Sequence, residues 1–323
     1  QPLAAQQQLA DSVELLLQTQ LPDSQRAIAM VYRAMYYETI DTIRSRQLYK
    51  EAIDYAAKKK MDYPLGYALH YSMFLNIANG NYAAHAADME RALHHLSRSP
   101  NKKATVVMGL VMNDKASMFY KDEMYDSAVA WYLKSITILE KEKRLDKAVS
   151  SYTNLSAVYQ ILNLREKQKE YTTKSLEAAR LIGRKYDLFS AYSNLSQYYS
   201  GEDDYKNALL YADSANLYFT AEMTQKRIQI YYLIRAQAFN GLEKFDSALF
   251  YYQKTYELTK STNDTWGMTE PLMFMGNAYW KLGKKVEAEA FAAFCLAKGT
   301  INILINNAGS FMPGNILDEA DGN

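Results

Sequence analysis

From Met112 onward the sequence repeats with a period of 40 residues. One register holds only small residues: Ala116, Ser156, Ser196, Ala236 and Gly276. Three positions later every residue is aromatic: Phe119, Tyr159, Tyr199, Phe239 and Tyr279. Four positions before the small residue every residue is large and apolar: Met112, Tyr152, Tyr192, Tyr232 and Leu272. A fixed internal period of this length indicates a stacked array of one supersecondary unit.

Each repeat reads as a pair of α-helices. The large, small and aromatic registers are spaced by three and four residues, which places them on one helix face. A break follows, and a second amphipathic stretch begins, as in 125–140 and 245–260. Gly201, Gly241 and Gly283 fall in the breaks, where glycine suits a left-handed residue that ends a helix. Such a hairpin cannot bury its apolar face alone and must stack on its neighbours.

The pattern resembles the tetratricopeptide repeat. The first-helix signature of that family is matched by Tyr152, Leu155, Ser156 and Tyr159, and again by the same types 40 residues later. Its second-helix signature is matched by three further residues: Ala248, Tyr252 and Thr255. The period of 40 exceeds the family's 34, and the terminal proline is absent. Stretched repeats of this kind resemble those of bacterial regulatory and sensor proteins.

The resemblance implies an all-α fold, a right-handed α-solenoid of about seven hairpins. Two earlier hairpins are expected at 24–60 and 64–99, where the spacing of aromatic residues drifts. We therefore expect a capping helix in residues 1–23, a helical repeat domain over 24–296 and an unrelated tail over 297–323.

Composition excludes several classes of function. With 37 basic and 36 acidic side chains, the net charge of +1 gives no long-range attraction to nucleic acid. No run of about 18 apolar residues is present, so no membrane insertion is expected. Cys295 is the only cysteine, and His85 with Asp88 lacks a third metal ligand. Because no nucleophile–base pair or glycine-rich phosphate loop is evident, no enzyme activity, cofactor or metal is expected.

The resemblance also implies where a partner binds, since family members contact ligands along three rows of the first helices, which line a concave groove. The eleven candidate residues are Asn113, Thr153 and Ser193 in the first row; Ser117, Gln197, Gln237 and Asn277 in the second; and Tyr120, Gln160, Asn240 and Trp280 in the third. A lining of neutral amides, hydroxyls and aromatic rings suits an extended backbone or a partner helix. The same residues also fit ordinary solvated helix positions.

The tail follows a different pattern. Residues 299–309 form an Ile-rich run ending in Asn306, Asn307, Ala308 and Gly309, and this segment resembles the short-chain dehydrogenase/reductase family. The Gly-rich dinucleotide turn and the catalytic Tyr-x-x-x-Lys of that family are missing around it. We interpret the tail as a junction between unrelated sequences, or as a coincidental extension, and expect it to pack poorly against the repeats.

The favoured hypothesis is a non-catalytic protein- or peptide-binding scaffold, the recognition part of a bacterial regulatory or sensor system. One alternative is a self-assembly module that forms a homodimer. Another is a non-functional fragment of an NAD(P)-dependent reductase fused to a repeat domain. The sequence leaves the compartment open between periplasm and cytoplasm, and a processed N-terminus at Gln1 would favour the periplasm.

Overall fold

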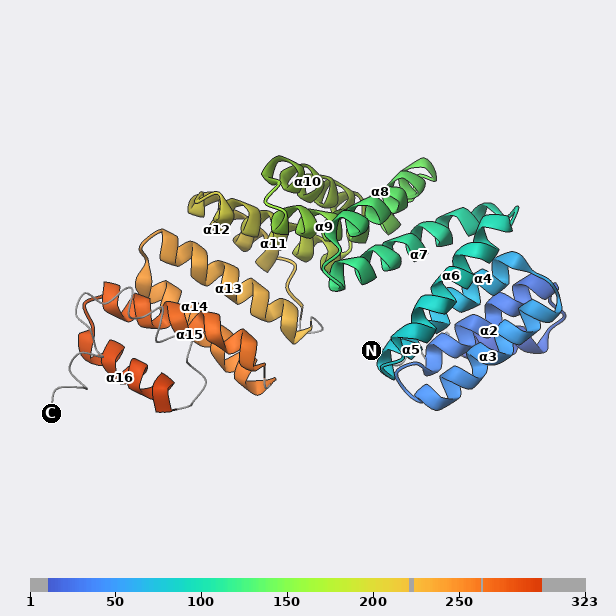
Figure 1. Cartoon of the computed structure of the whole chain (residues 1–323), viewed down its shortest axis with the longest axis horizontal. Coiled ribbons are helices and arrows are strands. Elements are labelled where there is room, and N and C mark those ends of the chain that lie inside the picture. The colour runs from blue at the N-terminus through green and yellow to red at the C-terminus, as the bar shows by residue number, and fades with distance from the viewer. Residues whose placement is uncertain (1–10, 221–223, 263, 298–323) are drawn as a thin grey trace. The chain divides into compact units, whose positions relative to one another are not determined.

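The computed structural model describes residues 11–220, 224–262 and 264–297, and every regular element in those ranges is an α-helix. The chain divides into two compact units, Gln1–Leu164 and Arg165–Asn323, called unit 1 and unit 2 below. Consecutive helices pack as hairpins within each unit (Figure 1), which confirms the predicted all-α solenoid architecture. The predicted strand and turn of the tail lie outside the described residues.

In the described part of unit 1, a helix at 11–18 is followed by three hairpins and one further helix. Its helices are α2 (Asp23–Tyr37), α3 (Thr42–Lys58), α4 (Asp62–Ser72), α5 (Phe74–Ala78), α6 (Tyr82–Arg98), α7 (Lys102–Lys121), α8 (Tyr125–Lys141) and α9 (Leu145–Ile161). Asp41, Asn81 and Asn101 cap α3, α6 and α7, each accepting a backbone N–H with its side chain.

Unit 2 is built from helical hairpins of the same kind. Its helices are α10 (Arg165–Ile182), α11 (Lys185–Gly201), α12 (Tyr205–Asn216), α13 (Gln225–Gly241), α14 (Phe245–Ser261), α15 (Thr265–Lys281) and α16 (Lys285–Ala297). The pairs α11 with α12, α13 with α14 and α15 with α16 form hairpins. Across the described parts of both units, no helix combines the length and the apolar character needed to cross a bilayer.

Small residues bring the paired helices close together, as the repeat pattern predicts. In unit 1 the hydroxyl of Ser45 on α3 donates to the carbonyl of Ala34 on α2 at 2.9 Å. In unit 2 the hydroxyl of Ser196 on α11 donates to the carbonyl of Ala208 on α12 at 2.6 Å. A side chain this short reaches the backbone of the facing helix only when the two backbones nearly touch.

The turns between paired helices depart in part from the prediction. Gly283 has a φ of 71°, as expected of a glycine after a helix. Gly201 and Gly241 instead end their own helices, and Glu243 takes the left-handed conformation with a φ of 57°. A Cβ on Gly241 would lie 2.4 Å from the ring of Tyr205. This glycine therefore makes room for an aromatic ring of the preceding hairpin.

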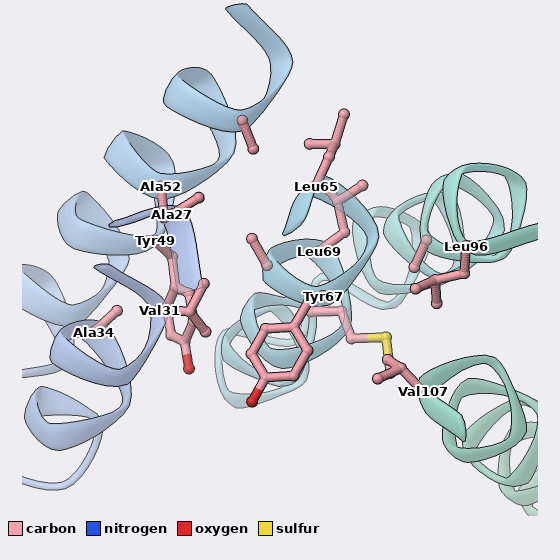
Figure 2. Close-up of a cluster of buried hydrophobic side chains, with 14 of the residues drawn as sticks. Ala27, Val31, Ala34, Tyr49, Ala52, Leu65, Tyr67, Leu69, Leu96 and Val107 are labelled. Atoms are coloured by element: carbon pink, nitrogen blue, oxygen red, sulfur yellow. The ribbon is translucent and has the colours of Figure 1, made fainter. Parts of the chain in front are cut away.

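The core of unit 1 runs continuously from α2 to α7. Figure 2 shows side chains of this core on α2, α3, α4, α6 and α7. Val31, Leu69 and Met89 are almost completely buried, and so is the large ring of Tyr49. Because each hairpin shares its apolar face with the next, the hairpins are stabilised by mutual burial.

Candidate binding surfaces

Two of the candidate residues in unit 1 are used inside the protein. Asn113 on α7 accepts a hydrogen bond from Ser151 of α9 at 3.0 Å, and its amide nitrogen donates to Asp114 at 3.3 Å. The hydroxyls of Ser117 and Tyr132 lie 2.9 Å apart, joining α7 to α8. These side chains hold neighbouring helices together, which limits how much they can offer a partner.

The other unit 1 candidates are Tyr120, Thr153 and Gln160, all half-buried. Tyr120 makes an edge-to-face contact with Tyr125, with ring centroids 6.1 Å apart. The carbonyl of Thr153 accepts a hydrogen bond from Ser156. Gln160 near the end of α9 has no hydrogen-bonded side-chain partner among the described residues. Its amide is therefore available to a ligand.

In unit 2 the candidates lie on the three first helices α11, α13 and α15. Gln237 on α13 donates to the carboxylate of Glu270 on α15 at 2.7 Å. Burial raises the pKa of Glu270, and the hydrogen bond from Gln237 opposes that rise. Gln237 is thus engaged by a neighbouring helix. Trp280 has the ammonium group of Lys285 5.5 Å from its ring centroid.

Three candidate amides of unit 2 have no internal partner. Gln197, Asn240 and Asn277 occupy α11, α13 and α15, and we call them the amide row. Each is half-buried, and within the described ranges no side-chain hydrogen bond satisfies any of the three. Ser193, one turn before Gln197, is 7% exposed and its hydroxyl is also unpaired. Polar groups that are partly withdrawn from water and unpaired are ready to bond a ligand.

Two tyrosines at the same repeat position, Tyr132 and Tyr252, differ in the hydrogen bonding of their hydroxyl groups. Tyr132 bonds Ser117, whereas Tyr252, the equivalent residue three repeats later, is fully buried and its hydroxyl has no partner. The residue equivalent to Ser117 is Gln237, which bonds Glu270 instead. We expect Tyr252→Phe to raise stability by about 1 kcal/mol, because a buried unsatisfied hydroxyl is removed.

The matched substitution Tyr132→Phe should lower stability by about 1 kcal/mol, since Ser117 then loses a partner. Urea unfolding of both variants beside the natural chain measures the difference. Equal effects of the two substitutions would show that the hydroxyl of Tyr252 is bonded in solution.

Unit 1 also contains a pocket that none of the repeat positions predicts. Its volume is about 510 Å³, within the range of ligand-binding pockets. The pocket lies between α5, the start of α6 and the end of α7, and it is lined by Phe74, Ile77, Tyr82, His85, Asp114, Ser117, Met118, Lys121 and Asp122. Ser117 is the one candidate residue that lines it. The apolar side chains Phe74, Ile77 and Tyr82 are exposed at its rim.

The pocket lies beside an interruption in the first helix of this hairpin. At Met73 the chain passes from α4 to α5, and the carbonyl of Met73 accepts the Nδ1–H of His85 at 2.9 Å. The ring of Phe74 then lies against His85, with centroids 5.9 Å apart. His85 is therefore a packed histidine, and the described residues contain no cluster of three or more metal-ligating side chains.

A carboxyl group in the pocket has an unusual environment. Asp114 has only a fifth of its side chain exposed. Its Oδ2 lies 3.5 Å from Nδ1 of the buried His70, but the geometry is not that of a hydrogen bond, so Nδ1 remains unpaired. Burial raises the pKa of Asp114 to about 7, opposed by the hydrogen bond from Asn113. Burial lowers the pKa of His70 to about 4, so the histidine is neutral at neutral pH.

Comparisons with known proteins identify the fold. No protein-family model and no curated sequence matches the chain. Among solved structures, a signal transduction ATPase with numerous domains and a tetratricopeptide repeat sensor, from Pyrococcus horikoshii, matches with a TM-score of 0.63 and 15% identity. That match covers 87% of this chain and 44% of the Pyrococcus protein, so this chain spans less than half its length.

Two further structures match along most of their own length. Aspartyl phosphate phosphatase F from Bacillus subtilis has a TM-score of 0.59 and 12% identity, covering 87% of this chain and 71% of that protein. PilF from Pseudomonas aeruginosa has a TM-score of 0.56 and 16% identity, covering 77% of this chain and 97% of that protein. The chain therefore has a tetratricopeptide-like helical repeat fold, as its residue pattern predicts.

Proposed function

We propose that this chain is a non-catalytic scaffold that binds a protein or peptide along the face of the first helices that carries the amide row. The observation that supports this most directly is the presence of three half-buried amides without internal partners at related positions of successive hairpins. Stacked helical repeats form extended surfaces from the side chains of successive hairpins, and repeat proteins use such surfaces to bind their ligands.

The chemistry of the row suits a peptide backbone. Each amide side chain carries both a donor and an acceptor, like the peptide group itself. Packed helix axes lie about 8–10 Å apart, and an extended chain advances about 3.3 Å per residue. Gln197 on α11 and Asn240 on α13, two helices in contact, would therefore meet peptide groups about three residues apart.

The comparisons support a recognition role by analogy. The Pyrococcus protein is described as having a tetratricopeptide repeat sensor. A place for this chain in a bacterial regulatory or sensor system follows the same analogy, since one fold hosts many functions. Association with a second copy is the alternative use of an array of this kind, and it is distinguished by the dependence of mass on concentration.

A pull-down with the full chain tests the proposal. The variant Gln197→Ala/Asn240→Ala/Asn277→Ala should bind its partner from bacterial lysate and envelope fractions at least about tenfold more weakly, because three hydrogen bonds of about 0.5–1.5 kcal/mol each are lost. Quantitative mass spectrometry of the captured proteins measures the loss.

The matched control carries three alanine substitutions at exposed positions of second helices: Glu177→Ala, Lys206→Ala and Gln253→Ala. It should keep every partner of the natural chain. Binding along this face is ruled out if the amide-row variant also keeps all of these partners. It is also ruled out if the natural chain and the control capture no protein.

A further inference from the structure

The pocket of unit 1 combines a deep carboxyl group with an apolar entrance. Asp114 projects from the middle of α7, while Phe74 and Ile77 come from α5 and Tyr82 from the start of α6. The three rim side chains are between 38% and 53% exposed. Exposed apolar side chains gathered around a cavity indicate a binding site more than isolated ones do.

We infer that this pocket receives the side chain of a lysine or arginine from the polypeptide partner, with its cationic group at Asp114 and its aliphatic stem against the apolar walls. This inference rests on the proposed function, because it assigns a ligand class to a second surface of the same scaffold. Lysine and arginine are the side chains that join a long apolar stem to a permanent positive charge.

The charges around Asp114 leave room for an external cation. His70 is the only basic side chain of the described residues within 4 Å of its carboxylate, and burial keeps that imidazole neutral. A carboxylate that is largely withdrawn from water without a cation is unfavourable, as its raised pKa indicates. A cationic ligand would satisfy it by a charge-assisted contact.

The walls are suited to the rest of the side chain. Met118 on α7 packs against the core of unit 1 and also lines the pocket. Its thioether and the side chains of Phe74 and Ile77 form a surface that an aliphatic stem can cover. The ring of Tyr82 already faces a cation, since the ammonium group of Lys121 lies 4.6 Å from its centroid.

Lys121 gives the inference a second, opposite prediction. Its ammonium group lines the same pocket and would repel an incoming cation. Replacing Lys121 by methionine removes that charge and keeps the stem, so binding of a cation should become tighter. An anionic ligand would respond in the opposite direction. Asp122 at the rim carries the second carboxylate of the pocket and adds to its negative charge.

The test is a titration of the full chain, labelled with ¹³C in its isoleucine and methionine methyl groups, with Nα-acetyl-lysine methylamide. The norleucine analogue serves as the control, because it has the same stem without the ammonium group. The lysine probe should shift the signals of Ile77 and Met118 saturably, and norleucine should bind at least tenfold more weakly. Asp114→Asn should weaken lysine binding at least tenfold, and Lys121→Met should tighten it about two- to fivefold.

Equal binding of lysine and norleucine would overturn the inference, as would an unchanged affinity in Asp114→Asn. If Asp114→Asn does not fold, Lys121→Met decides: weaker lysine binding, or preferential binding of Nα-acetyl-glutamate methylamide, contradicts a cation site. The amide row lies in unit 2 and the pocket in unit 1. Loss of probe binding therefore refutes the cation pocket while the pull-down result for the amide row stands separately.

Discussion

Replacing Leu69 with alanine should destabilise unit 1 by about 3–5 kcal/mol. Leu69 is completely buried on α4, at the centre of the core that Figure 2 shows. The substitution removes the transfer free energy of the side chain and leaves a cavity that the neighbouring helices cannot close. Because α4 packs on α2, α3, α6 and α7, the damage should spread through unit 1.

Hydrogen exchange followed by mass spectrometry measures this change locally. Amides of α2 to α7 should exchange faster in Leu69→Ala, and amides of α11 to α15 in unit 2 should keep their natural rates. The control is Ile43→Ala, because Ile43 is 74% exposed on α3 and its loss should cost less than about 0.5 kcal/mol. Equally faster amide exchange in both units would contradict the expectation that each hairpin is stabilised mainly by its immediate neighbours.

The fold was predictable because each register position performs the same task in every repeat. Ala116 belongs to the small-residue register and Ala248 to the second-helix signature, and both are completely buried. Period and residue size together therefore indicated which faces would meet, and the comparisons with solved structures confirm the resulting fold. The residues that take the left-handed conformation in the turns were harder to predict. Glu243 adopts the left-handed backbone conformation that the pattern assigned to Gly241.

The candidate surfaces were predictable only in part. The repeat positions identified Gln197 and Asn277 in the second candidate row and Asn240 in the third, but they could not show which amides are already bonded. Gln237 is engaged because Glu270 happens to face it from the next hairpin, and Glu270 lies outside the registers that repeat. The face of a helix follows from spacing, whereas hydrogen bonding depends on which neighbour arrives there.

The pocket gave a weaker signal in the sequence. It depends on the break at Met73, which lies in the part of the chain where the spacing drifts and the 40-residue alignment fails. A charged residue in the middle of a largely apolar helix, Asp114 in α7, was the available indication. The sequence pattern could not show that the side chain of His70, on α4, lies beside Asp114.

The same carboxyl group should make the stability of unit 1 depend on pH. The pKa of Asp114 is raised to about 7 in the folded chain, against about 3.9 when unfolded. A raised pKa gives stability that is complete below about pH 4 and lost as the pH rises through 7. Asp114→Asn mimics the protonated acid at every pH, so it should become more stable than the natural chain by about 2–4 kcal/mol at pH 8.

Other titratable side chains face Asp114 and also contribute to the pH dependence of stability. From the helices packed against α7 and from α7 itself these are His70, Tyr71, His85, Lys121, Asp122 and Tyr132. The lowered pKa of His70 acts with the opposite sign, because its stability contribution is present above about pH 6.5 and lost as the pH falls through 4. The natural chain and Asp114→Asn both carry His70, so the difference between their free energies of unfolding reports on Asp114 alone.

Urea unfolding at pH 4, 6 and 8 measures that difference through the fluorescence of Trp131 on α8, with Trp266 and Trp280 replaced by phenylalanine. The gap between Asp114→Asn and the natural chain should be near zero at pH 4 and grow until about pH 7. Asp122→Asn removes an exposed carboxylate from the rim of the same pocket and should show a much smaller change. A gap that stays constant from pH 4 to pH 8 would mean that Asp114 is ionised throughout this range, because water or a cation reaches it in the folded chain.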